Sequence, residues 1–245
     1  MEATHNYRRW AGYLCFVPLP GLIVSLAVAR FPYPDDNLDG RHYLDYGLPH
    51  RTIEIQILTW IVTTLATCGF ILLLATILWR TARHVTITAL IMVCSATACV
   101  TTTLVCMGMY LTLSMTARGP NFQADRVDLE FSTYSWNATQ ILACFAAVFL
   151  GLAWAMIAAA NHRHPVLPRA LANTAIAVAA LDILPILSIF VDSGPWSPGS
   201  VGSYIPGAVA TYGWMIVTGS VLLRSQPKHP TTPIKLQFSS TERIQ

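Results

Sequence analysis

Long apolar stretches alternate with short polar ones along most of the chain. Six of these stretches reach about 20 residues, the length at which an α-helix crosses a hydrocarbon core of about 30 Å. The predicted helices are Trp10–Ala29, Ile53–Trp79, Val85–Leu113, Ala138–Ala160, Arg169–Val191 and Tyr204–Leu223. The predicted fold class is therefore all-α, a polytopic bundle of six membrane-spanning helices that forms one domain over residues 1–223. Residues 224–245 contain prolines and scattered charge, so we expect a tail with little order there.

The first apolar stretch contains two prolines, Pro18 and Pro20, which predict a kink near its middle. A charged start, an apolar run and the small residues Ala27 and Ala29 also fit a cleaved signal peptide. We favour a retained helix, because the apolar run is long and carries two prolines.

The composition supports a membrane protein. Hydrophobic residues make up 54% of the chain and charged residues only 11%, whereas a soluble domain has roughly 25% charged residues. The net charge of +3 does not indicate nucleic-acid binding, since the basic residues sort by membrane side and do not gather in a patch. All six cysteines lie in apolar stretches, which is typical of small packing residues and not of disulfides.

The basic residues predict the orientation. If the chain crosses the membrane six times, 10 of its 15 Lys and Arg residues lie on the side of the two termini. These are Arg8, Arg9, Arg80, Arg83, Arg163, Arg169, Arg224, Lys228, Lys235 and Arg243, while Arg30, Arg41, Arg51, Arg118 and Arg126 lie on the other side. Because cytoplasmic loops carry the excess of Lys and Arg, both termini are predicted to be cytoplasmic. The expected localisation is the cell membrane.

Asp182 lies deep in the fifth predicted helix, where an acid costs several kcal/mol unless it is protonated or hydrogen-bonded. Pro185 follows three residues later and cannot donate to the carbonyl of Leu181, so a backbone acceptor is left free one turn from the acid. No Lys or Arg lies deep in any apolar stretch, and we therefore expect Asp182 to be a neutral hydrogen-bond donor. An acid in this setting is a candidate functional residue.

Hydroxyl-bearing residues are predicted to share the depth of Asp182. Asp182 comes ten residues before Asp192, which places it about 15 Å below the outer end of its helix. The fourth predicted helix contributes only Val148 and Phe149 at this depth. The candidate ligand-binding residues are Asp182, Thr63, Thr67, Thr102, Thr103 and Tyr212. This polar layer is either a binding site or a set of hydrogen bonds that holds the helices together.

Small residues recur every fourth position in the fourth predicted helix, at Ala143, Ala147, Gly151, Ala155 and Ala159. A ridge of this kind lets a neighbouring helix approach closely. We favour a packing face within the bundle. The alternative is a face for a second copy of the chain or for another membrane protein.

Three functional classes remain open. The first is a protein that holds or moves a small hydrophobic or cationic ligand at Asp182. The second is an enzyme that acts on a lipid or isoprenoid substrate, with Asp182 and Glu54 as acid and base. The third is a non-catalytic subunit of a membrane complex. The chain has no nucleotide-binding, zinc-protease or serine-hydrolase motif, and no cofactor or metal is expected. A cavity at Asp182 would favour the first two classes, and a filled bundle the third.

Overall fold

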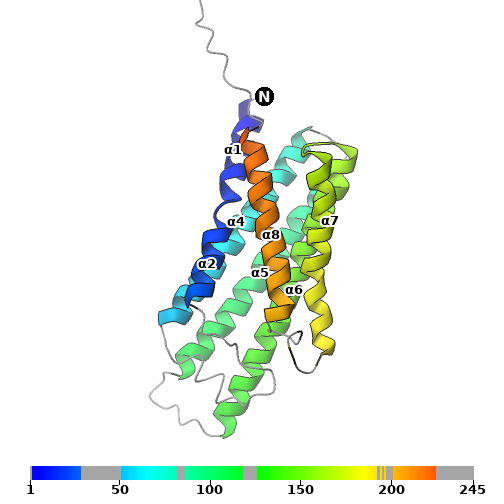
Figure 1. Cartoon of the computed structure of the whole chain (residues 1–245). Helices are drawn as coiled ribbons and strands as arrows, with labels where there is room; N and C mark the ends of the chain where they lie inside the picture. The colour runs from blue at the N-terminus through cyan, green and yellow to red at the C-terminus, as the bar shows by residue number, and fades with distance from the viewer. Residues whose placement is uncertain are drawn as a thin grey trace, which may run out of the picture.

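The computed structural model describes residues 2–28, 51–81, 86–117, 126–191, 194, 196 and 201–224, and within these ranges every regular element is a helix (Figure 1). The helices are α1 (Glu2–Leu14), α2 (Pro18–Val28), α4 (Arg51–Thr81), α5 (Thr86–Ala117), α6 (Arg126–Arg163), α7 (Arg169–Ile183), the 3-10 helix η2 (Leu184–Phe190) and α8 (Val201–Arg224). The all-α prediction is confirmed for these residues. Five stretches are long and apolar enough to cross a membrane, namely Glu54–Thr81, Thr86–Met115, Leu129–Arg163, Arg169–Phe190 and Gly202–Arg224.

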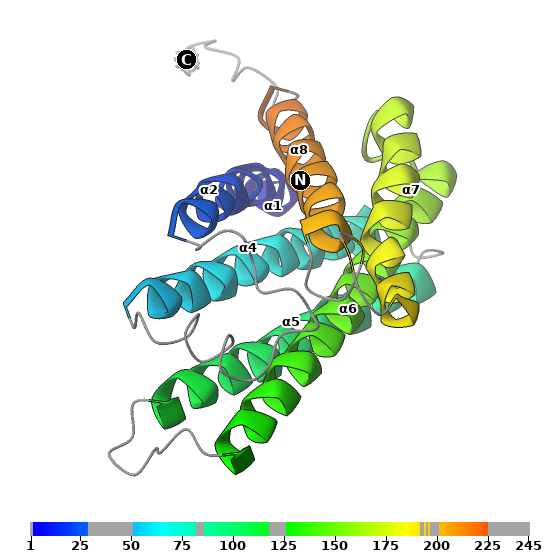
Figure 2. The ribbon, with the colours of Figure 1, turned by 60° about the horizontal axis from the view of Figure 1, so that its bottom comes forward.

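The helices pack in chain order around a ring. From α4 to α8 along the chain, each helix packs on the one that follows it. α1 closes the ring by packing on both α4 and α8 (Figures 1 and 2). The start of α1 and the end of α8 lie at the same end of the bundle, which we call the N/C end, and the opposite end is the far end. Gly219 permits the α1–α8 contact, because a Cβ there would lie 2.6 Å from the Cβ of Cys15 and 2.9 Å from the carbonyl oxygen of Gly12.

The first predicted helix is two helices. The prolines predict a kink within one helix, whereas the structure has a full break between two helices. α1 ends at Leu14, and α2 begins at Pro18. Proline suits the first position of a helix, because the N–H that it lacks would have no partner within the helix there. α1 packs along α8, whereas α2 follows α4 and has only a small contact with α8. The break therefore separates α2 from α8 in the far half of the bundle.

Two other boundaries also differ from the prediction. The predicted loop between the third and fourth helices is partly helical, since α6 begins at Arg126. No Gly or Pro occurs between Arg126 and Asn137, so nothing in the sequence stops the helix there. The fifth predicted helix changes to a 3-10 helix after Ile183, close to Pro185. The segment between the first two predicted helices and the predicted tail beyond Arg224 lie outside the described residues, and the signal-peptide alternative stays open.

The N/C half of the ring is filled with large side chains. The largest fully buried ones include Phe70, Ile71, Leu74, Ile77, Met92, Trp154, Ile157, Met215 and Leu222. At this end Asn161 fixes the link between α6 and α7: its Oδ1 accepts from the N–H groups of Val166 (2.8 Å) and Leu167 (2.6 Å). Its Nδ2 donates to the carbonyl of Leu167 at 2.9 Å. These bonds turn the chain so that α7 returns along α6.

Candidate functional site

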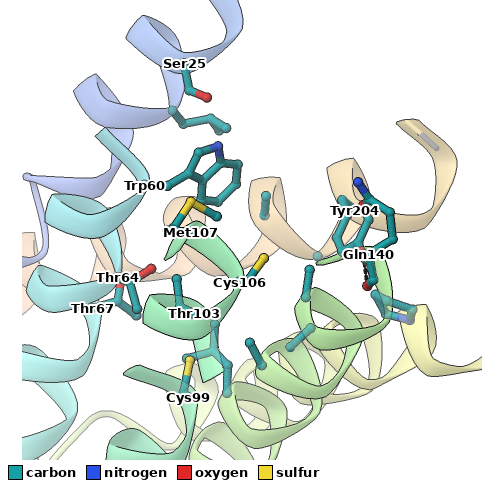
Figure 3. Close-up of a pocket in the computed structure, with 18 of the residues that line it drawn as sticks. Ser25, Trp60, Thr64, Thr67, Cys99, Thr103, Cys106, Met107, Gln140 and Tyr204 are labelled. Atoms are coloured by element: carbon teal, nitrogen blue, oxygen red, sulfur yellow. Dashed lines mark hydrogen bonds between the residues drawn. The ribbon is translucent and has the colours of Figure 1, made fainter. Parts of the chain in front are cut away.

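A cavity of about 240 Å³ occupies the far half of the bundle. It begins at Asp182 and reaches Gln56 and Ser114, which lie near the far-end termini of α4 and α5. Figure 3 shows Ser25 and Trp60 on one side of it and Tyr204 on the other. Since Ser25 belongs to α2 and Tyr204 to α8, the cavity occupies the space that opens where α2 leaves α8. The break before Pro18 is thus the structural origin of the cavity.

Asp182 lies in the wall of this cavity and is only 4% exposed. Its Oδ2 accepts two hydrogen bonds, from Nε1 of Trp154 on α6 at 2.8 Å and from Oγ1 of Thr211 on α8 at 2.6 Å. Its Oδ1 has no hydrogen-bond partner among the described residues. One carboxyl oxygen therefore joins α6, α7 and α8, while the other is left for a proton or a ligand.

Gly207 of α8 packs directly against the carboxyl group. A Cβ at this position would lie 2.7 Å from Oδ1 of Asp182 and 3.2 Å from the carbonyl oxygen of Leu181. Pro185 cannot donate to the Leu181 carbonyl, so this carbonyl is the one that the sequence predicts to be free. Gly207 also lines the cavity. The missing side chain at Gly207 thus lets α8 approach the carboxyl group closely.

We expect Gly207→Ala to destabilise the protein by about 1–3 kcal/mol, because the added methyl group displaces a carboxyl that two hydrogen bonds hold in place. Gly213→Ala is the matched control on the same helix, since a Cβ there would meet nothing within 4 Å. It should be neutral, or stabilising by up to about 1 kcal/mol through helix propensity. Thermal melting of both variants in detergent checks this. Equal melting temperatures would contradict the close contact at Gly207.

An aromatic cluster lies on the N/C side of Asp182. The ring centroids of Trp154 and Trp214 are 5.2 Å apart, and each lies 6.2 Å from that of Phe70. The indole N–H of Trp214 donates to the carbonyl of Leu171 at 2.9 Å, and that of Trp154 donates to Asp182. Both indoles are fixed by hydrogen bonds, so this aromatic cluster is a firmly held part of the buried core.

A polar network joins three helices farther along the cavity. The hydroxyl of Tyr204 on α8 donates to the carbonyl of Gln140 on α6 at 2.9 Å, as Figure 3 shows. The Nε2 of Gln140 donates in turn to the hydroxyl of Tyr110 on α5. The sulfur of Cys144 lies 3.3 Å from the Tyr204 hydroxyl. Polar groups of α5, α6 and α8 thus bind one another across this part of the wall.

The predicted polar layer coincides in part with the cavity wall. Thr67, Thr103 and Tyr212 line the cavity together with Asp182. Thr67 donates to the carbonyl of Thr63 at 2.9 Å, one turn back in the same helix. The structure places the other three candidates outside the lining: Thr63 is buried against Gly21 of α2, Thr102 is half-buried, and Glu54 is exposed.

The two hydrogen-bond partners of Asp182, Trp154 and Thr211, were not among the predicted site residues. An α-helix up to Val191 would rise 1.5 Å per residue, but the seven residues of η2 rise about 2.0 Å each. Asp182 is therefore about 3.5 Å deeper than predicted. Side chains also lean toward the N-terminus of their helix, so the indole of Trp154 reaches back along α6 toward the acid. An indole N–H in the middle of an apolar stretch needs an acceptor, and this signal could have identified Trp154.

The small-residue ridge of α6 has neighbours within the chain. Ala143 and Ala147 line the cavity. Gly151 packs on α7, where a Cβ would lie 2.8 Å from the carbonyl oxygen of Ala179 and 2.7 Å from Cγ1 of Ile183. Ala159 is exposed. A contact with a second protein at the exposed part of this ridge stays a prediction.

The site thus combines a mostly apolar chamber, one buried carboxyl with an unused oxygen, and an aromatic cluster that holds this carboxyl through Trp154. No protein-family model, curated protein or solved structure matches this chain, so the function proposed below rests on its own residues.

Proposed function

We propose that the chain is a multi-pass membrane protein that holds or moves a small hydrophobic or cationic ligand at Asp182. The observation that supports this is a cavity of about 240 Å³ that ends at a buried carboxyl. A bundle with a filled interior would instead have supported a purely structural subunit. Because an apolar cavity of about 150 Å³ holds benzene, a ligand of about ten non-hydrogen atoms fits this volume.

The enzyme alternative rests on two carboxyl groups that share one site. Glu54 is exposed and is not among the residues that line the cavity. Acid and base catalysis by the pair would require both groups within hydrogen-bond reach of one substrate. The geometry therefore favours ligand binding over this chemistry.

Filling the cavity tests the proposal. Ala147→Phe places a ring into the chamber, and it should abolish the binding of small aromatic probes of about ten non-hydrogen atoms. In the wild type, a probe at 100 times its Kd should add about 2.7 kcal/mol of stability. That corresponds to a rise of about 5 °C or more in Tm. Calorimetric titration and thermal melting in detergent measure both quantities.

The matched control for this experiment is Ala177→Phe, the same change at an exposed position of α7. It should bind the probes as the wild type does. Equal probe binding by Ala147→Phe and Ala177→Phe, or no binding by the wild type, would overturn the proposed function.

We further propose six crossings with both termini in the cytoplasm, in which α1 and α2 together make one broken crossing. Five crossings would place the two termini on opposite sides of the membrane. A sixth crossing is needed if both termini are to lie on the same side. Basic residues support this orientation, because Arg8, Arg9, Arg80, Arg163, Arg169 and Arg224 belong to helix segments at the N/C end. Among the described helices, only α4 and α6 carry an Arg at the far end, at their first residues.

Labelling on intact cells should show this topology. A membrane-impermeant maleimide should modify Asn37→Cys, between α2 and α4 in the sequence, and should leave Ser240→Cys, beyond α8, unmodified until the cells are opened. The parent chain, whose six cysteines are free, gives the background. Modification of Ser240→Cys on closed cells would refute the cytoplasmic tail.

A further inference from the structure

We propose that the ligand is a protonated lipophilic amine, and that it replaces the proton of Asp182 when it binds. This inference rests on the proposed function, since it names the class of molecule that the same cavity takes. It follows from the unused oxygen of Asp182, the charge balance of the cavity wall and the kind of side chains that line it.

The geometry of Asp182 calls for one more hydrogen-bond donor. Trp154 and Thr211 both donate to Oδ2, and Oδ1 receives no donor from the described residues. Asp182 and Gly207 both line the cavity, so the carboxyl group borders the space that a ligand would occupy. An ammonium group carries three N–H donors and no acceptor, which suits a carboxyl oxygen in a confined site. A ligand with an amine at one end supplies the missing bond.

Charge balance requires a cation if Asp182 ionises. No Lys, Arg or His lies among the described residues that line the cavity. The titratable groups that face Asp182 are Cys99 of α5 and Tyr212 of α8, with Cys68 of α4 beside them. None of them is a basic group, so none supplies a positive charge. From α6 the acid meets Trp154, which does not titrate. Either a proton or a cationic ligand must therefore neutralise the carboxylate, and an anionic ligand finds no counterion.

The walls suit an apolar body attached to that cation. Five aromatic residues line the cavity, Trp60, Tyr110, Trp136, Tyr204 and Tyr212. The faces of aromatic rings attract cations and also cover apolar surface. The combination of one acid with aromatic walls is selective for molecules that are both cationic and hydrophobic.

Binding then exchanges one cation for another. In the empty site Asp182 carries its proton as a carboxylic acid. When the ammonium enters, the carboxyl O–H bond breaks, the proton passes to water, and an N–H group of the ligand donates to Oδ1. The site is neutral before and after, so one proton leaves for each amine that binds.

Two probes of the same size and shape test this inference. 2-Phenylethylamine is a cation at neutral pH, and 2-phenylethanol is its neutral counterpart. Wild-type protein in weakly buffered detergent should bind the amine at least tenfold more tightly than the alcohol. Amine binding should release one proton per molecule bound, measured with a pH indicator, and alcohol binding none. Asp182→Asn should lose the preference for the amine and release no proton.

The outcomes separate the two proposals. Equal affinities for amine and alcohol in the wild type, or amine binding without proton release, would overturn the exchange at Asp182 and leave the cavity as a binding site. If neither the amine nor the alcohol binds, the proposed function is overturned, and this inference with it. A thermal melting transition of Asp182→Asn in detergent reports that the variant is folded, and if it does not fold, the proton count of the wild type still decides.

Discussion

Gly151→Leu should destabilise the protein by about 3 kcal/mol or more, a large part of the stability of an ordinary domain. The first added carbon alone would lie 2.7 Å from Ile183 Cγ1 and 2.8 Å from the carbonyl oxygen of Ala179. The second of these atoms belongs to the backbone of α7, so it cannot move aside by a change of side-chain rotamer. To admit a leucine, α6 and α7 must separate, and α7 carries Asp182. Thermal melting in detergent and yield after purification measure the loss.

Two comparisons isolate the cause of that loss. Gly108→Leu makes the same change in α5 at a position where a Cβ meets nothing within 4 Å, and it should be tolerated. Leu150→Ala removes a half-buried side chain that already borders the cavity, so it should cost about 2 kcal/mol, at the low end for such truncations. If Gly151→Leu and Gly108→Leu melt at the same temperature, the contact between α6 and α7 is not close.

The sequence predicts the helices well where hydrophobicity alone decides them. Three of the predicted membrane helices, those beginning at Ile53, Val85 and Tyr204, lie within α4, α5 and α8 apart from an end residue. The sequence does not predict the extension of α6 to Arg126, because polar residues outside an apolar core can be either helix or loop. Whether these residues form a helix depends on local helix propensity and on the burial of Ser132 and Trp136, which only tertiary contacts supply.

The candidate site shows a similar limit. The acid, its depth in an apolar segment and the nearby Thr67, Thr103 and Tyr212 follow from residue type and spacing. The partners of Asp182 depend on helix rotation and on the change to a 3-10 helix at Pro185, which the spacing of apolar residues does not reveal.

The cavity itself has a local cause that the sequence only hints at. Pro18 and Pro20 indicate an interruption, but a kinked helix could still pack along α8 for its whole length. A full break allows α1 to stay on α8, through Gly12 and Gly219, while α2 stays on α4. The space between α2 and α8 is a consequence of that divergence. In this protein a helix break near the N-terminus thus creates the chamber that ends at Asp182 on another helix.

Replacing Asp182 by leucine should cost about 2–3 kcal/mol, whereas Asp182→Asn should change stability by less than about 1 kcal/mol. Leucine leaves the indole N–H of Trp154 without an acceptor in a site where Trp154 is fully buried. Thr211 suffers less, because its hydroxyl can turn to the carbonyl one helical turn back. Asparagine keeps an oxygen that accepts from both donors. Thermal melting of the two variants in detergent measures the difference.

A double-mutant cycle assigns the cost to the indole. Trp154→Phe removes the N–H donor and keeps a ring in the aromatic cluster, so in that background Asp182→Leu should cost about 1–2 kcal/mol less than in the wild type. Thr211→Val is the matched comparison. In that background Asp182→Leu should cost nearly as much stability as in the wild type, since the threonine hydroxyl has another acceptor within its own helix. An equal cost of Asp182→Leu with and without the indole would mean that the 2.8 Å bond from Trp154 contributes nothing to folding. A reduced cost would show that Asp182 stabilises the protein through the hydrogen bond that its Oδ2 accepts from Trp154.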